Sequence, residues 1–262
     1  MGNFIKLENF SKLLPYVDMF KEGLIVTVLL AFFTVIIGFV LALVLALMRM
    51  SNFHPFGFLG LTKDGHLRDG GFLYHLSRFN PVSFLATAYV EIIRSTPVVV
   101  QVFIIYYGIF STLFELPSIR LFGFIRFERF FPGVVALAMN SGAYLCEIIR
   151  SGIQSIDGGQ TEAARSLGLS QGQNMRFIIL PQAIKNILPA LGNEFVNMIK
   201  QASLASVFFV SELTTSYRTV STASFLAIEP LLISGLIYLA VTTVFGWLVG
   251  VLEHRLAVSN AG

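Results

Sequence analysis

The most constraining feature of this chain is an uncharged run of 26 residues, Gly23 to Met48. As a helix it would be about 39 Å long, whereas the hydrocarbon core of a bilayer is about 30 Å thick. Hydrophobic residues make up 55% of the chain and charged residues only 13%, and the mean hydropathy is +0.76. The run therefore predicts a tilted transmembrane helix in an integral membrane protein. It is too long for the apolar region of a cleaved signal peptide, which has about 7–15 residues.

The rest of the sequence predicts a single all-α transmembrane domain over residues 23–255. An N-terminal interfacial segment, residues 1–22, precedes it, and a C-terminal tail, residues 256–262, follows it. Polar, turn-rich stretches separate the apolar ones, so a bundle of five spans is expected. The spans are expected at about 23–48, 81–114, 130–150, 187–210 and 230–252.

The second span carries an unusual set of polar residues. Helical spacing places Glu91, Arg94 and Gln101 on one face, which predicts that the charges point into the bundle. Pro97 predicts a kink and leaves the carbonyl of Ile93 without its helical donor. Glu91 and Arg94 either form a structural ion pair or line a transport pathway. The sequence favours neither of these two hypotheses.

Polar residues also follow the third and fourth spans at helical spacing. They form two stripes: Asn140, Tyr144, Glu147 and Ser151 in the third span, and Asn193, Asn197 and Lys200 in the fourth. Such residues either line a pathway or join helices by hydrogen bonds, which contribute about 0.6 kcal/mol on average in bilayers. We favour packing for the asparagines and a pathway or gate role for Glu147 and Arg94.

A long polar insert interrupts the C-terminal half between Gly158 and Pro181, within a loop expected at 152–185. Thr161 is a good N-cap residue, and Gly168 can adopt the left-handed conformation that ends a helix. We therefore expect a short helix with Ala163, Ala164 and Leu167 on one side, and with Glu162 and Arg165 on its flank. A helix this short needs a packed loop or a partner surface for stability.

Several classes of function are disfavoured by the sequence. The formal charge of +3 is not gathered in a polybasic block, so no nucleic-acid partner is expected. His54, His66 and His75 lie in the loop 49–80 without the spacing of a metal site, so no metal is expected. No catalytic triad is evident, and no Gly-x4-Gly-Lys-Ser/Thr phosphate loop occurs. The lone Cys146 excludes an internal disulfide and is expected to serve packing.

The polar insert also carries a family resemblance. Glu162-Ala163-Ala164 is followed after three residues by Gly168, and after nine more by Ile178, Leu180 and Pro181. This spacing resembles the EAA loop of ABC importer permeases. The flanking motifs resemble the branch that carries polar amino acids: Gly142-Ala143-Tyr144, Glu147-Ile148-Ile149-Arg150, Gly159-Gln160, Pro181-Gln182-Ala183, Leu188-Pro189, and the stretch from Glu91 to Gln101 that leads to Ile105-Tyr106-Tyr107-Gly108.

The resemblance covers about residues 20–255, with some departures. Ser95 stands where that branch usually has glycine. Gln201-Ala202 follows Lys200 where an acidic or polar residue and then a hydroxyl residue are more usual. Residues 52–80 are longer than the connection expected there, which makes this segment a solvated loop or an added contact with a partner.

What the resemblance implies is a permease subunit of a type I, ATP-driven ABC importer in the bacterial inner membrane. Its expected partners are a second permease subunit, an ABC ATPase dimer that holds ATP and Mg²⁺, an external solute-binding protein and membrane lipid. The chain itself would be no enzyme and would need no cofactor. The short helix would be a cytoplasmic coupling helix, and the ATPase-coupling residues would be Gly159, Gln160, Glu162, Ala163, Ala164, Leu167, Gly168, Leu180 and Pro181.

Five spans and a cytoplasmic coupling loop place the N-terminus outside and the C-terminus inside. Lys and Arg support this orientation weakly, with nine expected inside and seven outside. The nine are Arg49, Lys63, Arg68, Arg78, Arg150, Arg165, Arg176, Lys185 and Arg255, and the seven are Lys6, Lys12, Lys21, Arg120, Arg126, Arg129 and Arg218. The alternative function is a self-contained secondary transporter or channel. It predicts an internal repeat with broken helices, which the sequence does not show.

Overall fold

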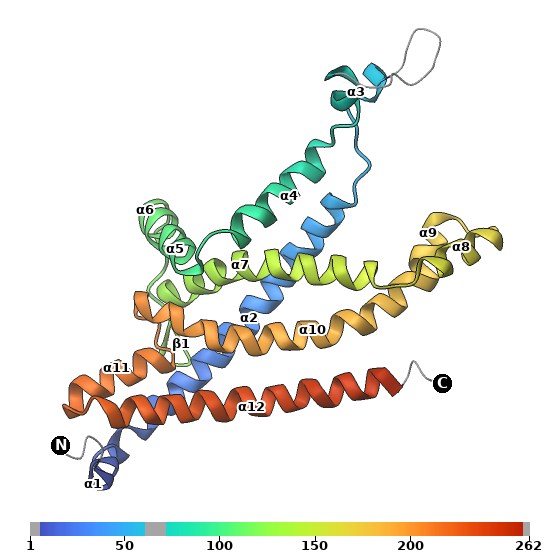
Figure 1. The fold of residues 1–262 in the computed structure, drawn as a ribbon. Coiled ribbons are helices and arrows are strands. Elements are labelled where there is room, and N and C mark those ends of the chain that lie inside the picture. Colours follow the sequence, from blue (N-terminus) through green and yellow to red (C-terminus); the bar gives the residue numbers. More distant parts are fainter. Residues whose placement is uncertain (1–5, 61–71, 259–262) are drawn as a thin grey trace.

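The computed structural model describes residues 6–60 and 72–258, and this part of the chain is almost entirely helical (Figure 1). A two-stranded antiparallel hairpin, β1 (Arg120–Leu121) and β2 (Ile125–Arg126), pairs Arg120 with Arg126. The long helices are α2 (Val17–Arg49), α4 (Pro81–Arg94), α7 (Phe127–Gln154), α10 (Leu180–Gln201), α11 (Leu213–Ser224) and α12 (Ile228–Val258).

Shorter helical pieces connect these helices. Three are 3₁₀ turns, at Leu14–Tyr16, Gly57–Gly60 and Ala202–Phe208, and two are π-helical turns, at Ile104–Phe110 and Met175–Ile179. The short α-helices are α1 (Leu7–Ser11), α3 (Phe72–Ser77), α5 (Val98–Phe103), α6 (Ser111–Leu113), α8 (Gly158–Ser166) and α9 (Gln171–Asn174).

Helices α7, α10 and α12 run side by side, and α2 crosses them obliquely (Figure 1). The crossing of α2 and α7 is close because each helix presents a glycine. A Cβ on Gly142 would lie 2.8 Å from the side chain of Leu41 and 3.2 Å from the carbonyl oxygen of Gly38. Small residues allow such backbone contact in membrane bundles. Cys146 is fully buried in the apolar cluster beside this crossing, so its predicted packing role is confirmed.

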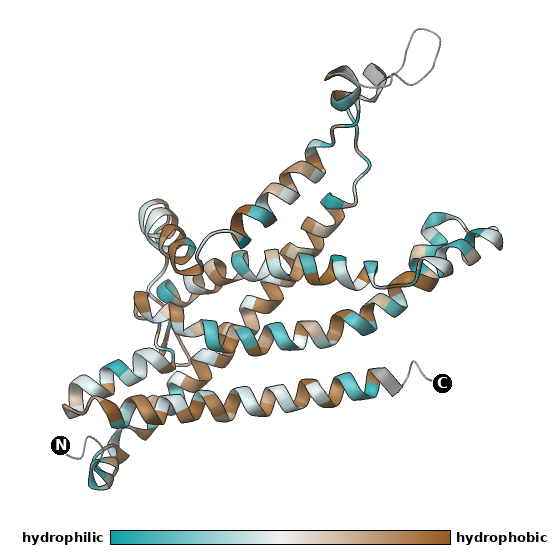
Figure 2. Ribbon diagram, viewed as in Figure 1, coloured by the Kyte–Doolittle hydropathy of each residue, from teal (hydrophilic) through white to brown (hydrophobic). Residues whose placement is uncertain are grey.

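The predicted all-α transmembrane bundle is confirmed. Within the described residues, three helical stretches are long and apolar enough to span a membrane: Leu14–Arg49, Phe127–Gln154 and Ile228–Leu256. The bent pair of Pro81–Arg94 and Val98–Leu113 makes a fourth. Helix α10 has 22 residues and packs between α7 and α12. Its composition is more polar, because it contains Lys185, Glu194, Lys200 and three asparagines. Figure 2 shows the contrast between α10 and the apolar α2 and α12.

Several boundaries differ from those expected. Helix α2 begins at Val17, so the first span takes in the last residues of the predicted interfacial segment. Helix α12 covers Ile228–Val258 and exceeds the predicted 230–252. The expected span 187–210 is α-helical only to Gln201; it continues as a 3₁₀ turn and stops at Phe209, whose φ is +56°. Helix α11 was not predicted, because serine and threonine have weak helix propensity.

The prediction of one kinked helix over 81–114 is wrong. Helices α4 and α5 meet at 109°, and Pro97 is the N-cap of α5 rather than an interior residue. The freed carbonyl of Ile93 was predicted correctly: it accepts a hydrogen bond from the side-chain amide of Gln101, at 2.6 Å. The same amide donates to the carbonyl of Thr96, at 3.0 Å. Gln101 therefore folds back over the break and does not continue the face of Glu91 and Arg94.

The connection between α2 and α4 is not only a loop, because it contains a 3₁₀ turn and α3. His54 and His75 are exposed there. His66 and the predicted turn at Lys63, Asp64 and Gly65 lie outside the described residues. Among the residues that the structure describes, no group of three His, Cys, Asp or Glu side chains could hold a metal ion.

Candidate functional site

Helix α8 extends past the ends of α7 and α12, at one end of the bundle (Figure 1). Helix α8 and the neighbouring α9 form a hydrophilic tip at this end of the bundle (Figure 2). The chain reaches this tip from α7 and returns through α9 and a π-helical turn into α10. A shift of α8 would therefore act directly on two long helices of the bundle.

The start of α8 differs from the prediction. Asp157 is the N-cap, and its carboxylate accepts the amide of Gly159 at 2.9 Å. Helix α8 therefore has nine residues and begins at Gly158, four positions earlier than a helix capped by Thr161 would begin. Thr161 lies inside the helix and does not cap it. Aspartate is as good an N-cap as threonine and also favours the positive end of the helix dipole.

The predicted stop at Gly168 is confirmed. Gly168 has φ +80°, a conformation that costs other residues about 1–2 kcal/mol. Its amide donates to the carbonyl of Arg165 at 2.9 Å, and the amide of Leu169 donates to the carbonyl of Ala164 at 3.0 Å. These two bonds form a Schellman motif, in which a left-handed residue satisfies the last carbonyls of the helix.

The inner side of α8 is fastened to the returning chain. Ala164 is only 1% exposed. Thr161 accepts a hydrogen bond from the side chain of Asn174 at 3.2 Å, and the amides of Gln160 and Gln182 pair with each other at 3.2 and 2.5 Å. These contacts replace the stability that a helix of this length lacks in isolation.

The outer side of α8 is open. Leu167 is 81% exposed, and Glu162 and Ala163 are exposed as well. The expectation of a single face made of Ala163, Ala164 and Leu167 is therefore wrong, because Ala164 points inward and the other two point outward. Exposed leucine beside alanine and glutamate makes a small, mostly apolar contact surface with one negative charge.

Pro181 closes the polar insert that begins at Gly158. It lies in the first turn of α10, next to the half-exposed Leu180. Proline is tolerated there because the first amides of a helix have no intrahelical acceptor. The end of the candidate loop is therefore rigidly continuous with α10.

Replacing Gly168 by leucine is expected to destabilise the end of α8 by about 1–2 kcal/mol. The cause is backbone strain rather than a clash, because a Cβ at this position would meet nothing within 4 Å. Gly172→Leu is the matched control, since its surroundings are equally open and its φ is not positive. Hydrogen exchange of the α8 amides should accelerate in the first variant only; equal exchange in both would contradict the strain.

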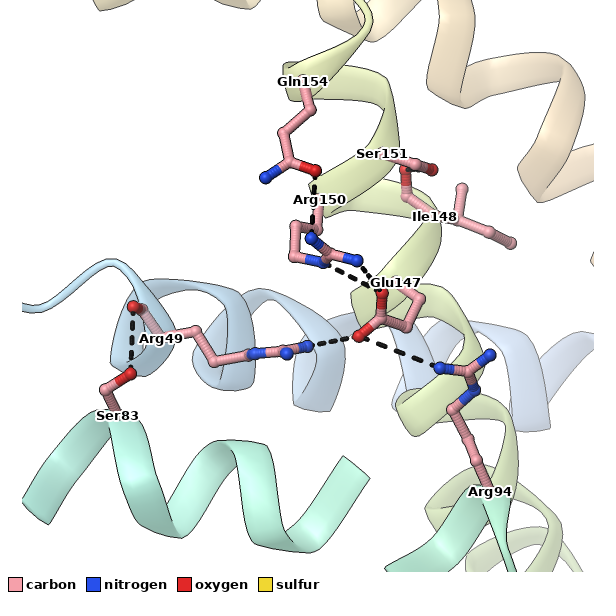
Figure 3. A network of polar contacts seen from close by, with 8 residues as sticks. All are labelled: Arg49, Ser83, Arg94, Glu147, Ile148, Arg150, Ser151 and Gln154. Atoms are coloured by element: carbon pink, nitrogen blue, oxygen red, sulfur yellow. Dashed lines mark hydrogen bonds and ion pairs between the residues drawn. The ribbon is translucent and has the colours of Figure 1, made fainter. Parts of the chain in front are cut away.

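The second candidate site is a cluster of charges around Glu147 on α7 (Figure 3). Arg49, at the end of α2, donates to one carboxylate oxygen. Arg150 approaches the other oxygen with Nη2 at 2.8 Å, and Arg94, at the end of α4, lies 3.9 Å from the first. The carboxylate and Arg49 are each only 17% exposed. One acid therefore ties together three helices and faces three cations.

The predicted pair of Glu91 and Arg94 does not form among the ion pairs of the described residues. Glu91 is exposed, whereas Arg94 turns toward α7 and also stacks 5.6 Å above the ring of Tyr144. A cleft of about 390 Å³ opens beside the cluster, with Arg49 and Arg150 in its wall. Arg94 therefore contacts α7 although its side chain is 39% exposed, whereas Glu91 joins no ion pair among the described residues.

The other predicted polar residues join helices or face outward. The amide of Asn140 donates to the side-chain oxygen of Gln101 at 2.9 Å, which ties α7 to α5. Asn197 lies 3.4 Å from the carboxylate of Glu194, which also accepts the hydroxyl of Ser141 at 3.0 Å. Asn193 and Lys200 on α10 are exposed.

Three polar residues with contacts between elements or at a helix cap were not predicted from the sequence: Arg49, Ser141 and Glu212. Arg49 was assigned to a loop because it closes the uncharged run. Glu212 is fully buried and caps α11 by accepting the amides of Thr214 and Thr215, each at 2.7 Å. Burial raises the pKa of Glu212, and these hydrogen bonds oppose that rise. An acid before a run of threonine and serine was the available signal for a helix cap.

The fold and the exposed loop define a multi-pass membrane protein, and the sequence has no phosphate loop. Residues 70–258 match the family of binding-protein-dependent transport system inner membrane components. The chain belongs to this family. It is therefore a transport subunit rather than an enzyme, and such a system also comprises an ATPase and a substrate-binding protein.

Curated relatives match nearly the whole chain. The arginine transport system permease protein ArtQ of Bacillus subtilis is 34% identical over 248 residues, which cover 95% of this chain and 97% of ArtQ. The nopaline transport system permease protein NocM of Agrobacterium fabrum is 39% identical over 247 residues, or 94% and 88% of the two chains. The probable glutamine ABC transporter permease protein GlnM of Bacillus subtilis is 34% identical over 251 residues, or 96% and 99%.

Solved structures agree with this membership. A crystal structure of an amino acid ABC transporter with histidines has a chain that is 37% identical, with a TM-score of 0.78; the match covers 96% of this chain and 100% of that one. The MetNI methionine ABC transporter in an inward-facing conformation has a TM-score of 0.60 at 16% identity, with 91% and 98% covered, which shows a shared fold.

Proposed function

We propose that this chain pairs with a second permease subunit, identical or related, to form the pathway of an importer for a polar amino acid. In this proposal the loop 158–181 couples the pathway to an ABC ATPase dimer. This proposal rests mainly on the two sides of α8. The inner side packs against the returning chain through Ala164 and Thr161, and the outer side is exposed at Leu167.

Each coupling residue has a distinct part in this proposal. Glu162, Ala163 and Leu167 contact the ATPase. Gly168 ends the helix, and Gly159 and Gln160 shape its first turn. Leu180 and Pro181 begin α10, so a push on α8 reaches the bundle without a flexible joint. ATP binding draws the two ATPase subunits together and moves the two loops with them, which switches the bundle between two packings.

ATP and Mg²⁺ are bound by the ATPase in this proposal, and this chain supplies no cofactor site. The α8 tip and the C-terminal end of α12 lie at the same end of the bundle, and the N-terminal helix α1 lies at the other (Figure 1). A cytoplasmic ATPase thus places the C-terminus inside and the N-terminus outside in the bacterial inner membrane. The solute-binding protein docks on the outer side.

The cargo is proposed from the relatives, which are named for arginine, nopaline and glutamine transport. The pathway and gate residues are proposed to be Glu91, Arg94, Pro97, Gln101, Asn140, Tyr144, Glu147, Asn193, Asn197 and Lys200. Within this set the charge cluster fits a gate, because Glu147 holds the ends of α2 and α4 against α7 and can release them when the helices move.

Uptake into proteoliposomes tests this function. The chain is reconstituted with its ATPase and binding protein, and labelled arginine, glutamine and other polar amino acids are offered. We expect uptake of one of them only when ATP, the ATPase and the binding protein are all present. Uptake by the chain alone under an ion gradient would overturn the proposal and favour the self-contained secondary transporter or channel.

A further inference from the structure

The connection between α2 and α4 presents an unusual surface of exposed aromatic rings. We call its described residues, 50–60 and 72–80, the aromatic arm. Phe58 is 69% exposed and Phe72 is 78% exposed, and Phe53, Phe56 and Phe79 are exposed as well. Phenylalanine has no polar group to face water, so a surface of this kind indicates a covering partner.

The position of the arm distinguishes it from the α8 tip. Figure 1 shows α3 displaced to the side of the bundle, roughly level with the adjacent ends of α7 and α12, whereas α8 reaches beyond those ends. A segment beside the bundle at the level where the helices end lies at the boundary between lipid and water. A segment beyond the helix ends lies in water.

The arm is continuous with a surface that faces lipid. Phe84, Leu85 and Ile92 on α4 are 58%, 62% and 62% exposed, as expected for the outer side of a spanning helix. The rings of Phe79 and Phe84 lie 5.6 Å apart between centroids, so the last aromatic residue of the arm touches the first of α4. The exposed apolar surface of α4 therefore continues onto the base of the arm at Phe79.

The charge of the arm also fits a membrane surface. Its described residues contain no Asp or Glu, and their one charged side chain is the exposed Arg78. The guanidinium of Arg78 lies 4.8 Å from the centre of the Tyr74 ring. Phenylalanine beside a basic residue is typical of segments that lie at the membrane interface, with the apolar rings toward the acyl chains and the basic side chain toward the phosphates.

We propose that the aromatic arm lies in the lipid headgroup region of the bilayer, on the same side as α8, with Phe58 and Phe72 inserted at the acyl boundary. The base of the arm would then fix the ends of two spans. Asn80 caps α4 by accepting the amide of Ser83 at 3.0 Å and donates to the carbonyl of Ser51 at 2.5 Å. Ser83 in turn donates to the carbonyl of Arg49 at 3.3 Å, so the anchor adjoins the Glu147 cluster.

Tryptophan fluorescence tests the arm without reference to cargo. In a Trp247→Phe background, a single tryptophan is placed by Phe72→Trp, by Phe58→Trp or, as the water-facing control, by Gln171→Trp on α9, which is exposed and is not among the proposed ATPase contacts. Each variant is reconstituted with its ATPase in ordinary and in brominated phospholipid. We expect brominated lipid to quench the two arm tryptophans at least twofold more than the control, and aqueous acrylamide to quench them weakly.

Two outcomes would overturn the proposal. Arm tryptophans quenched by acrylamide and not by brominated lipid would face water. Arm tryptophans protected from both quenchers, and exposed to acrylamide when the ATPase is omitted, would be covered by protein. Neither result would contradict the proposed transport function. Conversely, failed transport together with strong quenching by brominated lipid would contradict the transport function and still support the membrane anchor.

Discussion

Replacing Glu147 by glutamine is expected to lower the stability of the protein by about 3 kcal/mol, because a buried ion pair loses its only acid. Arg49 is 17% exposed and would keep an uncompensated charge, whereas Arg94 and Arg150, at 39% and 46% exposed, can be hydrated. The effect should appear as a lower Tm of the purified protein in detergent and as reduced uptake.

Glu91→Gln is the matched control, because Glu91 is an exposed acid on the neighbouring α4. The Tm of this variant should hardly differ from that of the unmodified protein.

A double variant tests the pairing of Arg49 with Glu147 directly. Glu147→Leu leaves Arg49 charged and unpaired, whereas Arg49→Leu with Glu147→Leu removes both ends of the buried pair. The double variant should be more stable than the single one, since apolar replacement of a whole pair is often neutral. Equal Tm values would show that Arg49 is not paired in the folded protein.

The bundle could be predicted because its main signals are local. The uncharged run of α2 and the 23 uncharged residues of 230–252 need no partner to be recognised as spans. The break at Pro97 was predicted only as a kink. Proline specifies the loss of one amide, but the angle of 109° also depends on Gln101 folding back to satisfy Ile93 and Thr96. That choice depends on tertiary packing.

The two candidate sites also differ in whether their residues lie close together in the sequence or come together only in the fold. The α8 loop was visible because Glu162, Gly168 and Pro181 stand at fixed spacing in one stretch, although its N-cap was misplaced by four residues, from Asp157 to Thr161. The charge cluster was not visible as a cluster. Glu147 meets Arg49 across 98 positions of sequence, and helical spacing alone can only say that Glu147 shares a stripe with Tyr144.

Reversing the charge of Glu162 is expected to reduce ATP-driven uptake at least about tenfold while leaving the bundle intact. Glu162 is exposed on the outer side of α8, and its side chain holds no described contact that the fold requires, so stability should change by no more than about 0.5 kcal/mol. At a docking surface, in contrast, a like-charge contact costs several kcal/mol, and about 1.4 kcal/mol already corresponds to a factor of ten.

Glu253→Lys supplies the matched control, because Glu253 is an exposed glutamate in the last turns of α12. The C-terminal end of α12 lies at the same end of the bundle as α8 (Figure 1). Both variants should have the Tm of the unmodified protein. Only Glu162→Lys should lose uptake and lose co-purification with the ATPase or the stimulation of ATP hydrolysis by the binding protein. Equal loss in both variants would assign the effect to the net charge of that end. Normal uptake by Glu162→Lys would remove α8 from the path by which ATP drives the bundle.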